Sequence, residues 1–169
     1  QPKFKNVPGS ENMIDEDLEK VELEEELNTK GFKGKGKMGK GGIYDYQIET
    51  IMKPFRNKGF LGVISIDEIH KLLPKINGQT KVSFIMNTQP STTPNGHWVA
   101  VFIDTKNDES VEYYDSFADD PPKQFMQDIK SVISKLKADS YLKFKVNKII
   151  DQRSNTDNCG LFAMKFIID

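Results

Sequence analysis

The chain has 169 residues, of which 37% are hydrophobic and 29% are charged, and its formal net charge is −1. This length favours one domain with an additional arm, and the hydrophobic content is sufficient for one α/β core. The single cysteine excludes an intrachain disulfide, and no apolar run approaches the length of a membrane-spanning helix. The chain opens on Gln1 without a secretory signal pattern, so we interpret it as a processed piece of a protein.

Residues 1–42 differ in composition from the remainder of the chain. Residues 11–26 are dense in Asp and Glu, and their apolar residues recur near helical spacing, which predicts a short acidic amphipathic helix. Residues 30–42 are almost entirely Lys and Gly, and the entropy cost of ordering so much glycine predicts a flexible linker. We therefore expect an acidic, then Lys/Gly-rich flexible arm over residues 1–42, followed by one folded domain over residues 43–169.

The folded domain is expected to begin with two helices. Residues 46–55 can form a helix that ends near Pro54. Ser65 and Glu68 have the spacing of a capping box, in which each residue satisfies a backbone N–H at a helix start. The second helix therefore begins at Ser65 and is expected to end at Pro74.

The middle of the domain has the pattern of a sheet. Residues 82–87 predict a strand, and residues 88–96 predict a loop because they carry Pro, Ser, Thr and Gly. Residues 98–104 form a continuous apolar run, which is typical of a central strand that is buried on both faces. Residues 111–115 are expected to return as its hairpin partner.

The last part of the domain alternates helix, strand and helix. Pro122 marks the start of a helix with an apolar face that extends to Leu136. Residues 144–150 alternate in polarity and predict a further strand, and Cys159 opens the closing helix. The fold class predicted from these elements is α+β, a short sheet with helices packed on it.

Three side chains with reactive groups lie at the ends of these predicted elements. Cys159 stands where a polar loop becomes a helix, and the positive end of a helix dipole favours a thiolate. His97 directly precedes the central strand, and Asp115 directly follows the next one. A cysteine, a histidine and a carboxylate are the minimum set for a thiol nucleophile, its base and the group that orients the base. The sequence therefore predicts a cysteine hydrolase.

Each of these residues also has a structural interpretation. A lone buried cysteine is usually a small hydrophobic side chain, a histidine at a strand start can be structural, and Asp115 can cap a strand end. The order of the motifs favours the catalytic interpretation. The matching residues are His97 with Trp98, Asp115 with Ser116, Gln152, Asn155, and Cys159 with Gly160, Leu161 and Phe162. In this order they resemble the adenain-like branch of the Ulp1-type cysteine peptidases, the adenovirus maturation protease group.

Two departures from the cellular pattern favour the viral branch of this family. Cellular enzymes that remove SUMO or ubiquitin-like proteins usually have Asp directly before the cysteine and Gln six residues before it. Here Asn158 precedes Cys159, and Gln152 lies seven residues upstream. Residues 87–100 look like proteases of Maverick/Polinton transposons and virophages, and the resemblance covers residues 43–169.

The resemblance implies the fold and the catalytic roles. It implies a cysteine protease domain over residues 43–169 with a short mixed sheet and the catalytic cysteine at a helix N-terminus. In the family, the residues at the positions of Cys159, His97 and Asp115 are nucleophile, general base and orienting carboxylate. Gln152 would donate an amide hydrogen bond to the oxyanion, alongside the backbone N–H of Cys159, although a loop amide can also satisfy backbone groups.

Three further residues are candidates for substrate binding: Trp98, Asn155 and Gly160. In the family, the aromatic residue after the histidine lines a narrow cleft, which explains a preference for Gly-containing sites; plain core packing is the alternative for Trp98. Asn155 can instead hold the loop before Cys159 through bonds to the backbone. Gly160 requires an unhindered helix start, so alanine there should be poorly tolerated.

Other chemistries have little support in the sequence. One cysteine and two distant histidines do not give the spacing of a zinc site, and His70 is expected to be a surface or packing residue on a helix. The glycines of residues 34–39 follow no strand and lack phosphate-loop spacing, so they predict no nucleotide site. We expect an enzyme without a metal or another cofactor.

The resemblance implies an endopeptidase that processes viral capsid or core precursors during virion maturation and cuts near Gly-containing sites. The alternatives are a deconjugating peptidase for a ubiquitin-like protein, and an inactive protease scaffold that binds DNA or capsid. The basic residues 30–40 could give salt-dependent affinity for DNA. Covalent activation by a peptide through a second cysteine is excluded because Cys159 is the only one, whereas noncovalent DNA activation stays open.

The same resemblance suggests where the protein works and with what. The expected partners are viral structural precursor proteins, with no membrane association, and the expected state is a monomer. The expected location is the virion and the infected host cell, in a cytoplasmic or nuclear virus factory. Gly41 and Gly42 lie at the boundary between arm and domain, and we interpret them as a candidate self-processing site.

Overall fold

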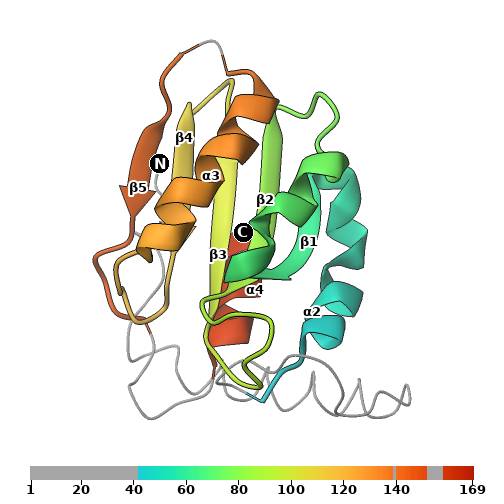
Figure 1. The fold of residues 1–169 in the computed structure, drawn as a ribbon, viewed down its shortest axis with the longest axis vertical. Coiled ribbons are helices and arrows are strands. Elements are labelled where there is room, and N and C mark those ends of the chain that lie inside the picture. Colours follow the sequence, from blue (N-terminus) through green and yellow to red (C-terminus); the bar gives the residue numbers. More distant parts are fainter. Residues whose placement is uncertain (1–41, 139, 152–157) are drawn as a thin grey trace.

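The computed structural model describes residues 42–138, 140–151 and 158–169, which form one mixed sheet with helices on both faces (Figure 1). The sheet has five strands in the order β1–β2–β3–β4–β5. The inner pairs β2–β3 and β3–β4 are antiparallel, and the outer pairs β1–β2 and β4–β5 are parallel. In chain order the strands are β1 (Phe60–Ser65), β2 (Lys81–Asn87), β3 (Trp98–Asp104), β4 (Ser110–Tyr114) and β5 (Lys143–Val146).

Helices precede, connect and follow these strands. Figure 1 shows α3 crossing one face of the sheet and α4 lying behind β3. The α-helices are α2 (Asp45–Met52), α3 (Lys123–Leu136) and α4 (Cys159–Ile168). The 3-10 helices are η3 (Lys53–Lys58) and η4 (Ile66–Lys75). The α+β fold class predicted from the sequence is confirmed.

Strand β3 is the centre of the sheet, as its continuous apolar run predicts. It pairs with β2 on one side and with β4 on the other, and every residue of β3 except Phe102 is buried. The register aligns Asn87 with Trp98 and Tyr114 with Ala100. The end of β2, the start of β3 and the end of β4 therefore meet at one edge of the sheet.

The sheet separates two apolar clusters. On one face, η4 and α3 contribute to the larger cluster, and α3 buries the predicted apolar residues Phe125, Ile129, Val132 and Leu136. On the other face, α2 and α4 pack with residues of β2, β3 and β4 such as Trp98. Helix α4 is apolar around most of its circumference because it is buried against the sheet.

Several element boundaries differ from the sequence-based predictions. Strand β1 was missed, although Gly59 marks its start with a φ of +94° and its backbone packs directly against Lys81 of β2. Helix α2 ends at Met52, near Pro54 as predicted, and Pro54 lies in the first turn of η3, where a missing N–H costs little. Pro74 lies inside η4, which continues to Lys75 and has 3-10 rather than α geometry.

The last predicted strand is shorter than expected. Residues 144–150 were expected to be a strand, but β5 ends at Val146 because Asn147 turns its side chain to the backbone of the neighbouring segment. The predicted arm lies outside the described residues except for Gly42. Among the described residues, no helix is long and apolar enough to span a membrane, and no cluster of three metal-ligating side chains occurs.

Candidate active site

His97 enters the site from the loop that joins β2 to β3. The loop closes at its base because the carbonyl of His97 accepts a hydrogen bond from the N–H of Thr88 at 2.9 Å. Gly96 packs against the side-chain amide of Asn87, and a Cβ atom at Gly96 would lie 1.9 Å from Asn87 Oδ1. A side chain at position 96 would therefore shift the backbone directly before His97.

Asp115 reaches the same edge from the end of β4. Because β3 and β4 are antiparallel neighbours, the residue after β4 lies beside the residue before β3. His97 Nε2 and Asp115 Oδ1 are 2.7 Å apart, and the two side chains are 14% and 3% exposed. The hairpin therefore brings together the histidine and the carboxylate predicted from the sequence.

Cys159 is the first residue of α4 and is buried. Helix α4 packs on β3, and the backbone N–H of Trp98 donates to Cys159 Sγ at 3.5 Å. The sulfur thus lies at the positive end of a helix and accepts a hydrogen bond from the residue after His97. Both features stabilise a thiolate.

The pKa of His97 is raised to about 9 from its usual 6.5. Burial alone would lower this pKa because it disfavours a charged imidazole. The hydrogen bond to Asp115, the interaction with the Cys159 side chain and the negative charges of these two groups together outweigh burial and raise the pKa. Asp115 is hydrogen-bonded to Nε2 of His97, and no described residue forms a hydrogen bond of ordinary length with Nδ1 of the same ring. Nδ1 is therefore the ring nitrogen left to exchange a proton with the sulfur.

Phe117 is a part of the site that sequence reasoning missed. Its ring stacks on the imidazole of His97 with the ring centres 4.9 Å apart. Its backbone N–H donates to Asp115 Oδ1 at 2.8 Å, on the oxygen that also holds His97. The residues after β4 thus fix both the carboxylate and one face of the imidazole.

Two buried polar residues after β5 tie this turn to the remainder of the domain, and sequence reasoning missed both. The side chain of Asn147 bonds both backbone groups of Asp115. Asp151 accepts a hydrogen bond from the hydroxyl of Tyr114 at 2.6 Å, and its N–H donates to Ser116 O at 2.8 Å. The only local sequence feature that marks Asn147 and Asp151 is that they are polar residues on either side of the apolar pair Ile149 and Ile150.

The predicted substrate-binding residues Trp98 and Gly160 are both buried. The indole N–H of Trp98 donates to Ile43 O at 3.2 Å, and the Trp98 side chain is 1% exposed. A Cβ atom on Gly160 would lie 2.4 Å from Ile43 Cγ2 and 3.1 Å from Trp98 Cδ1. The structure gives both residues a packing role that seats the start of α4, and a role in substrate binding stays a prediction.

Gln152 and Asn155 lie outside the described residues, so the predicted oxyanion donor and loop residue stay predictions. His70 is exposed on η4, which agrees with the predicted surface role.

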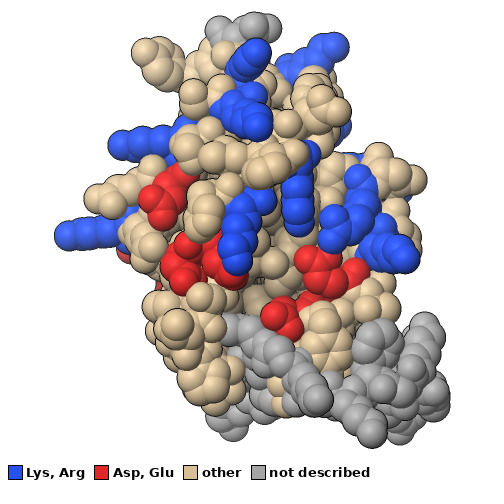
Figure 2. All heavy atoms as spheres, turned by 45° about the vertical axis from the view of Figure 1, so that its right-hand side comes forward, with Lys and Arg blue, Asp and Glu red and all other residues tan. Residues whose placement is uncertain are grey.

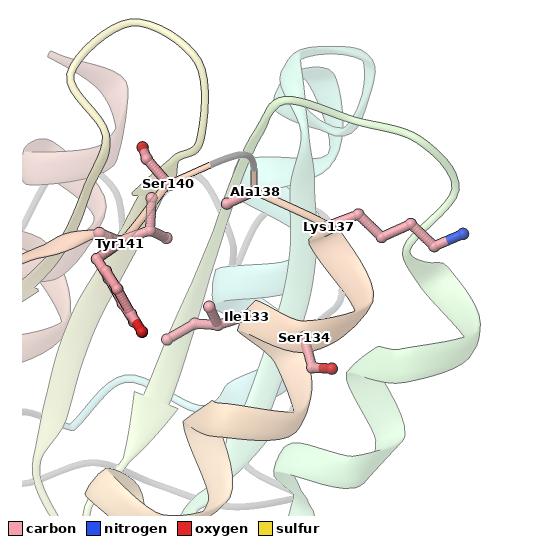
Figure 3. A pocket seen from close by; sticks show the side chains of 7 residues that line it. Ile133, Ser134, Lys137, Ala138, Ser140 and Tyr141 are labelled. Atoms are coloured by element: carbon pink, nitrogen blue, oxygen red, sulfur yellow. The ribbon is translucent and has the colours of Figure 1, made fainter.

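Two pockets of similar volume differ in chemical content. A pocket of about 470 Å³ adjoins the site and is lined by His97, Asp115, Phe117 and the exposed Asp119 and Asp120. A pocket of about 490 Å³ lies where α3 ends and the chain leads into β5, with Ile133 and Tyr141 on its walls (Figure 3). No described residue that lines the second pocket is a histidine, a cysteine or a carboxylate, whereas the first pocket contains His97 and Asp115.

Residues 76–168, more than half of the chain, match the model of the Ulp1 protease family, C-terminal catalytic domain. The chain belongs to the Ulp1 protease family. The match contains His97, Asp115 and Cys159, the three residues that the structure brings together. The resemblance to Ulp1-type peptidases noted in the sequence is confirmed.

Viral proteins are among the relatives of this Ulp1-family chain. A cysteine protease of African swine fever virus is 34% identical over 87 residues, which cover 49% of this chain and 31% of the relative. A protein of Acanthamoeba polyphaga mimivirus described as a thiol protease is 28% identical over 137 residues, which cover 72% of this chain and 45% of the relative. The chain thus spans less than half the length of these curated relatives.

The fold has a solved counterpart. The X-ray structure of the C-terminal Ulp1 protease domain in complex with Smt3, the yeast orthologue of SUMO, superposes with a TM-score of 0.53. The superposition covers 96% of this chain and 85% of that one at 16% sequence identity. The Ulp1-like fold predicted from the sequence is therefore confirmed.

Proposed function

We propose that this Ulp1-family chain is a cysteine endopeptidase in which Cys159 is the nucleophile, His97 the acid–base group and Asp115 the orienting carboxylate. The observation that carries the proposal is the position of His97, bonded to Asp115 at 2.7 Å and interacting with Cys159, with a pKa raised to about 9. At neutral pH the imidazole is protonated, which is the state that pairs with a thiolate.

The proposed reaction has two stages. The thiolate of Cys159 attacks the carbonyl carbon of the scissile peptide bond, and His97 gives its proton to the departing amine, so that a thioester forms and the peptide C–N bond breaks. A water molecule then attacks the thioester carbonyl while His97 accepts its proton. This step releases the acid product and restores the thiolate and the imidazolium.

The negative charge on the carbonyl oxygen during attack requires hydrogen-bond donors. The backbone N–H of Cys159, at the start of α4, is one proposed donor, and the side-chain amide of Gln152 is the other. A Gln152→Ala variant should lose roughly a hundredfold to a thousandfold in kcat with little change in KM, because the donor acts on the developing oxyanion. An unchanged kcat would remove Gln152 from this role.

The proposed substrates are viral structural precursors cut near Gly-containing sites. The proposal is supported by the viral relatives and by the resemblance to adenovirus-type maturation proteases. A virion or a virus factory in an infected cell would be the corresponding location. Steric reasoning is consistent with glycine, because the nucleophile is buried and a substrate without side chains near the scissile bond meets the least obstruction.

A peptide panel tests the activity directly. Wild type and Cys159→Ala are incubated with Gly-Gly-containing peptides, with and without iodoacetamide, and cleavage is followed by mass spectrometry. Cleavage of one bond by the wild type alone, abolished by iodoacetamide, is the expected result. Failure of the wild type to cut, together with a thiol that iodoacetamide does not modify, would favour an inactive scaffold.

A deconjugating peptidase for a ubiquitin-like protein is the second candidate function. The solved Ulp1 domain that shares this fold over most of the chain is in complex with Smt3. The chemistry at Cys159 would be the same, and only the surface that binds the substrate would differ. A ubiquitin-like protein carrying a C-terminal vinyl sulfone discriminates the two candidate functions. If this protein modifies Cys159 efficiently and a Gly-Gly peptide with the same reactive group does not, the chain must have a surface that binds the ubiquitin-like protein.

Noncovalent activation by DNA is a further proposal, supported by charge. Figure 2 shows Lys and Arg side chains, with Asp and Glu side chains among them, over the face that carries η3 and η4, where Arg56 pairs with Glu49 and Lys71 with Glu68. The exposed basic residues of these helices are Lys53, Arg56, Lys58, Lys71 and Lys75. Addition of duplex DNA to the peptide assay should raise the rate at low salt and lose this effect at high salt, and a rate that is independent of DNA would contradict the proposal.

The boundary at residue 43 is also a proposal. Ile43 is buried, its carbonyl accepts the indole N–H of Trp98, and its side chain contacts Gly160. These contacts support a protease domain that begins at residue 43, before the family match at residue 76. The proposed self-processing at Gly41 and Gly42 would be seen as a lower mass of the wild type, but not of Cys159→Ala, after incubation.

A further inference from the structure

Asn147 occupies the first position after β5 and its side chain is completely buried, at 0% exposed. Its amide makes three hydrogen bonds to the backbone. Oδ1 accepts from the N–H of Asp115 at 3.0 Å, while Nδ2 donates to Asp115 O at 2.6 Å and to Ile149 O at 3.2 Å. One side chain therefore satisfies both backbone polar groups of the residue that orients His97.

The sheet explains why Asn147 lies at this place. Strands β4 and β5 are parallel, and Tyr113 pairs with Val146. The next residues of the two strands diverge, since Asp115 begins a turn in which its carbonyl also accepts from the N–H of Ala118 at 2.8 Å. The Asn147 side chain continues the ladder at this point, bonding the N–H and the carbonyl of Asp115 in place of the main chain of β5.

The remaining bonds of Asp115 depend on this anchor. Asp115 Oδ1 accepts from Phe117 N–H and bonds His97 Nε2, and both contacts require the carboxylate to lie in one orientation. The bonds from Ala118 and Phe117 arise within the turn itself and would move with it. The two bonds from Asn147 come from a segment 32 residues away in the chain, and they fix the turn relative to the sheet.

We propose that Asn147 is a positioning residue that holds Asp115 in line with His97, an inference that rests on the proposed cysteine protease function. Asn147 does not touch the reacting atoms; it acts through the backbone of Asp115. Loss of its amide leaves a buried N–H and a buried carbonyl without their present partner, a cost that the turn can relieve by moving. A displaced carboxylate weakens the bond to His97 and lowers the fraction of protonated imidazole at neutral pH.

The test compares Asn147→Ala and Asn147→Ser with a matched core variant, Val132→Ala. Val132 is also completely buried but lies on α3, in the cluster on the other face of the sheet. The thermal midpoint of each variant reports the general loss of stability. NMR titration of the ring protons reports His97, and the exposed His70 serves as an internal reference because the chain has two histidines.

The expected result separates positioning from a purely structural role. Asn147→Ala should lower the titration midpoint of His97 by roughly one pH unit, Asn147→Ser should lower it less, and His70 should not move. Val132→Ala should lower the thermal midpoint while the titration of His97 stays in place. A His97 midpoint that is unchanged in a folded Asn147→Ala protein would overturn the proposal, and Asn147→Ser carries the same test if the alanine variant does not fold.

The kinetic readout is independent of this titration. If the wild type cleaves peptides, Asn147→Ala should lower kcat by up to roughly a hundredfold with little change in KM, because a misplaced acid–base group affects the chemical step. If the wild type cleaves nothing, the proposed function fails while the NMR titration still decides whether Asn147 controls His97.

Discussion

Cys159 and Asp115 reach the same site by different means. Cys159 is seated by apolar packing, since the start of α4 fits between Ile43 and Trp98 with no room for an additional carbon atom. Asp115 is held by hydrogen bonds with Asn147, Phe117 and His97. The position of Cys159, the proposed nucleophile, is thus sensitive to changes in volume, and that of the proposed acid–base pair is sensitive to changes in polarity.

This difference has a chemical reason. The helix terminus and an imidazolium stabilise a thiolate, and they offset the cost of apolar burial, which by itself disfavours the charged sulfur. The imidazole requires a defined tautomer and orientation, which only directional hydrogen bonds can give. Substitutions chosen for volume or for polarity therefore probe the two halves of the site separately.

The largest effect is expected for the nucleophile itself. Cys159→Ala should abolish peptide cleavage, a loss of roughly a thousandfold or more, because the thioester cannot form. The fold should be retained because a buried thiol and a methyl group are both small and apolar. Cleavage and the circular dichroism spectrum, measured on the same preparation, check this expectation; cleavage by the alanine variant would contradict it.

Removal of the charge on the polar half should have the next largest effect. Asp115→Asn keeps the shape but removes the carboxylate, so the His97 pKa should fall and the rate should drop by roughly a hundredfold to ten-thousandfold. The pH dependence of iodoacetamide modification of Cys159 measures this change. A control at Asp119→Asn, an exposed carboxylate beside the same pocket, should leave the profile close to that of the wild type.

A volume change on the apolar half should affect stability more than chemistry. In Gly160→Ala the new Cβ atom would overlap Ile43 Cγ2, and overpacking of this kind costs about 1–3 kcal/mol. Thermal unfolding should show the loss, and the double variant Gly160→Ala with Ile43→Ala should recover part of it because the overlapping atom is removed. A double variant less stable than the sum of the two single losses would show that the packing is misread.

Removing the aromatic ring that stacks on the His97 imidazole should have a smaller effect on the rate. Phe117→Leu keeps an apolar side chain and the backbone N–H to Asp115, but it removes the ring that stacks on His97. Aromatic contacts are worth about 0.5–1.5 kcal/mol, so kcat/KM should fall by roughly threefold to tenfold. Steady-state kinetics measures the loss, and a value equal to that of the wild type would show that the stacking has no part in catalysis.

A pH dependence of stability is expected from the bond between His97 and Asp115. The pKa of His97 is raised from 6.5 to about 9, so the folded state binds its proton more tightly than the unfolded state does. This contribution is complete below pH 6.5 and is lost as the pH rises from 6.5 to about 9. The free energy of unfolding should decline over this window in the wild type and decline less in Asp115→Asn. Equal slopes in the two proteins would contradict the assignment.

The sequence was informative where the chemistry and the chain order coincide. Residues 98–104 and 111–115 predicted the hairpin, and the residues at its ends, His97 and Asp115, are in contact. Cys159 was placed correctly at the start of a helix. Local patterns suffice for these residues because a continuous apolar run, a polar turn and a helix start are each defined by a few neighbouring residues.

The parts that were missed depend on distant contacts. Strand β1 contains Gly62 and directly follows Gly59, so local propensity disfavours a strand there, and pairing with β2 decides it. Asn147 looked like one more polar residue of a strand, and its role appears only when Asp115 lies beside it. Phe117 was missed because stacking on an imidazole has no local sequence signal.

Reaction of Cys159 with a mechanism-based probe tests the central claim most directly. The wild type and His97→Ala are incubated with a peptide that ends in Gly-Gly-vinyl sulfone, and intact-protein mass spectrometry follows the single cysteine. The cysteine protease account predicts one adduct on wild-type Cys159 and a rate at least roughly a hundredfold lower in His97→Ala. Equal rates in the two proteins, or the absence of an adduct with both this peptide probe and a ubiquitin-like protein carrying the same vinyl sulfone, would contradict it.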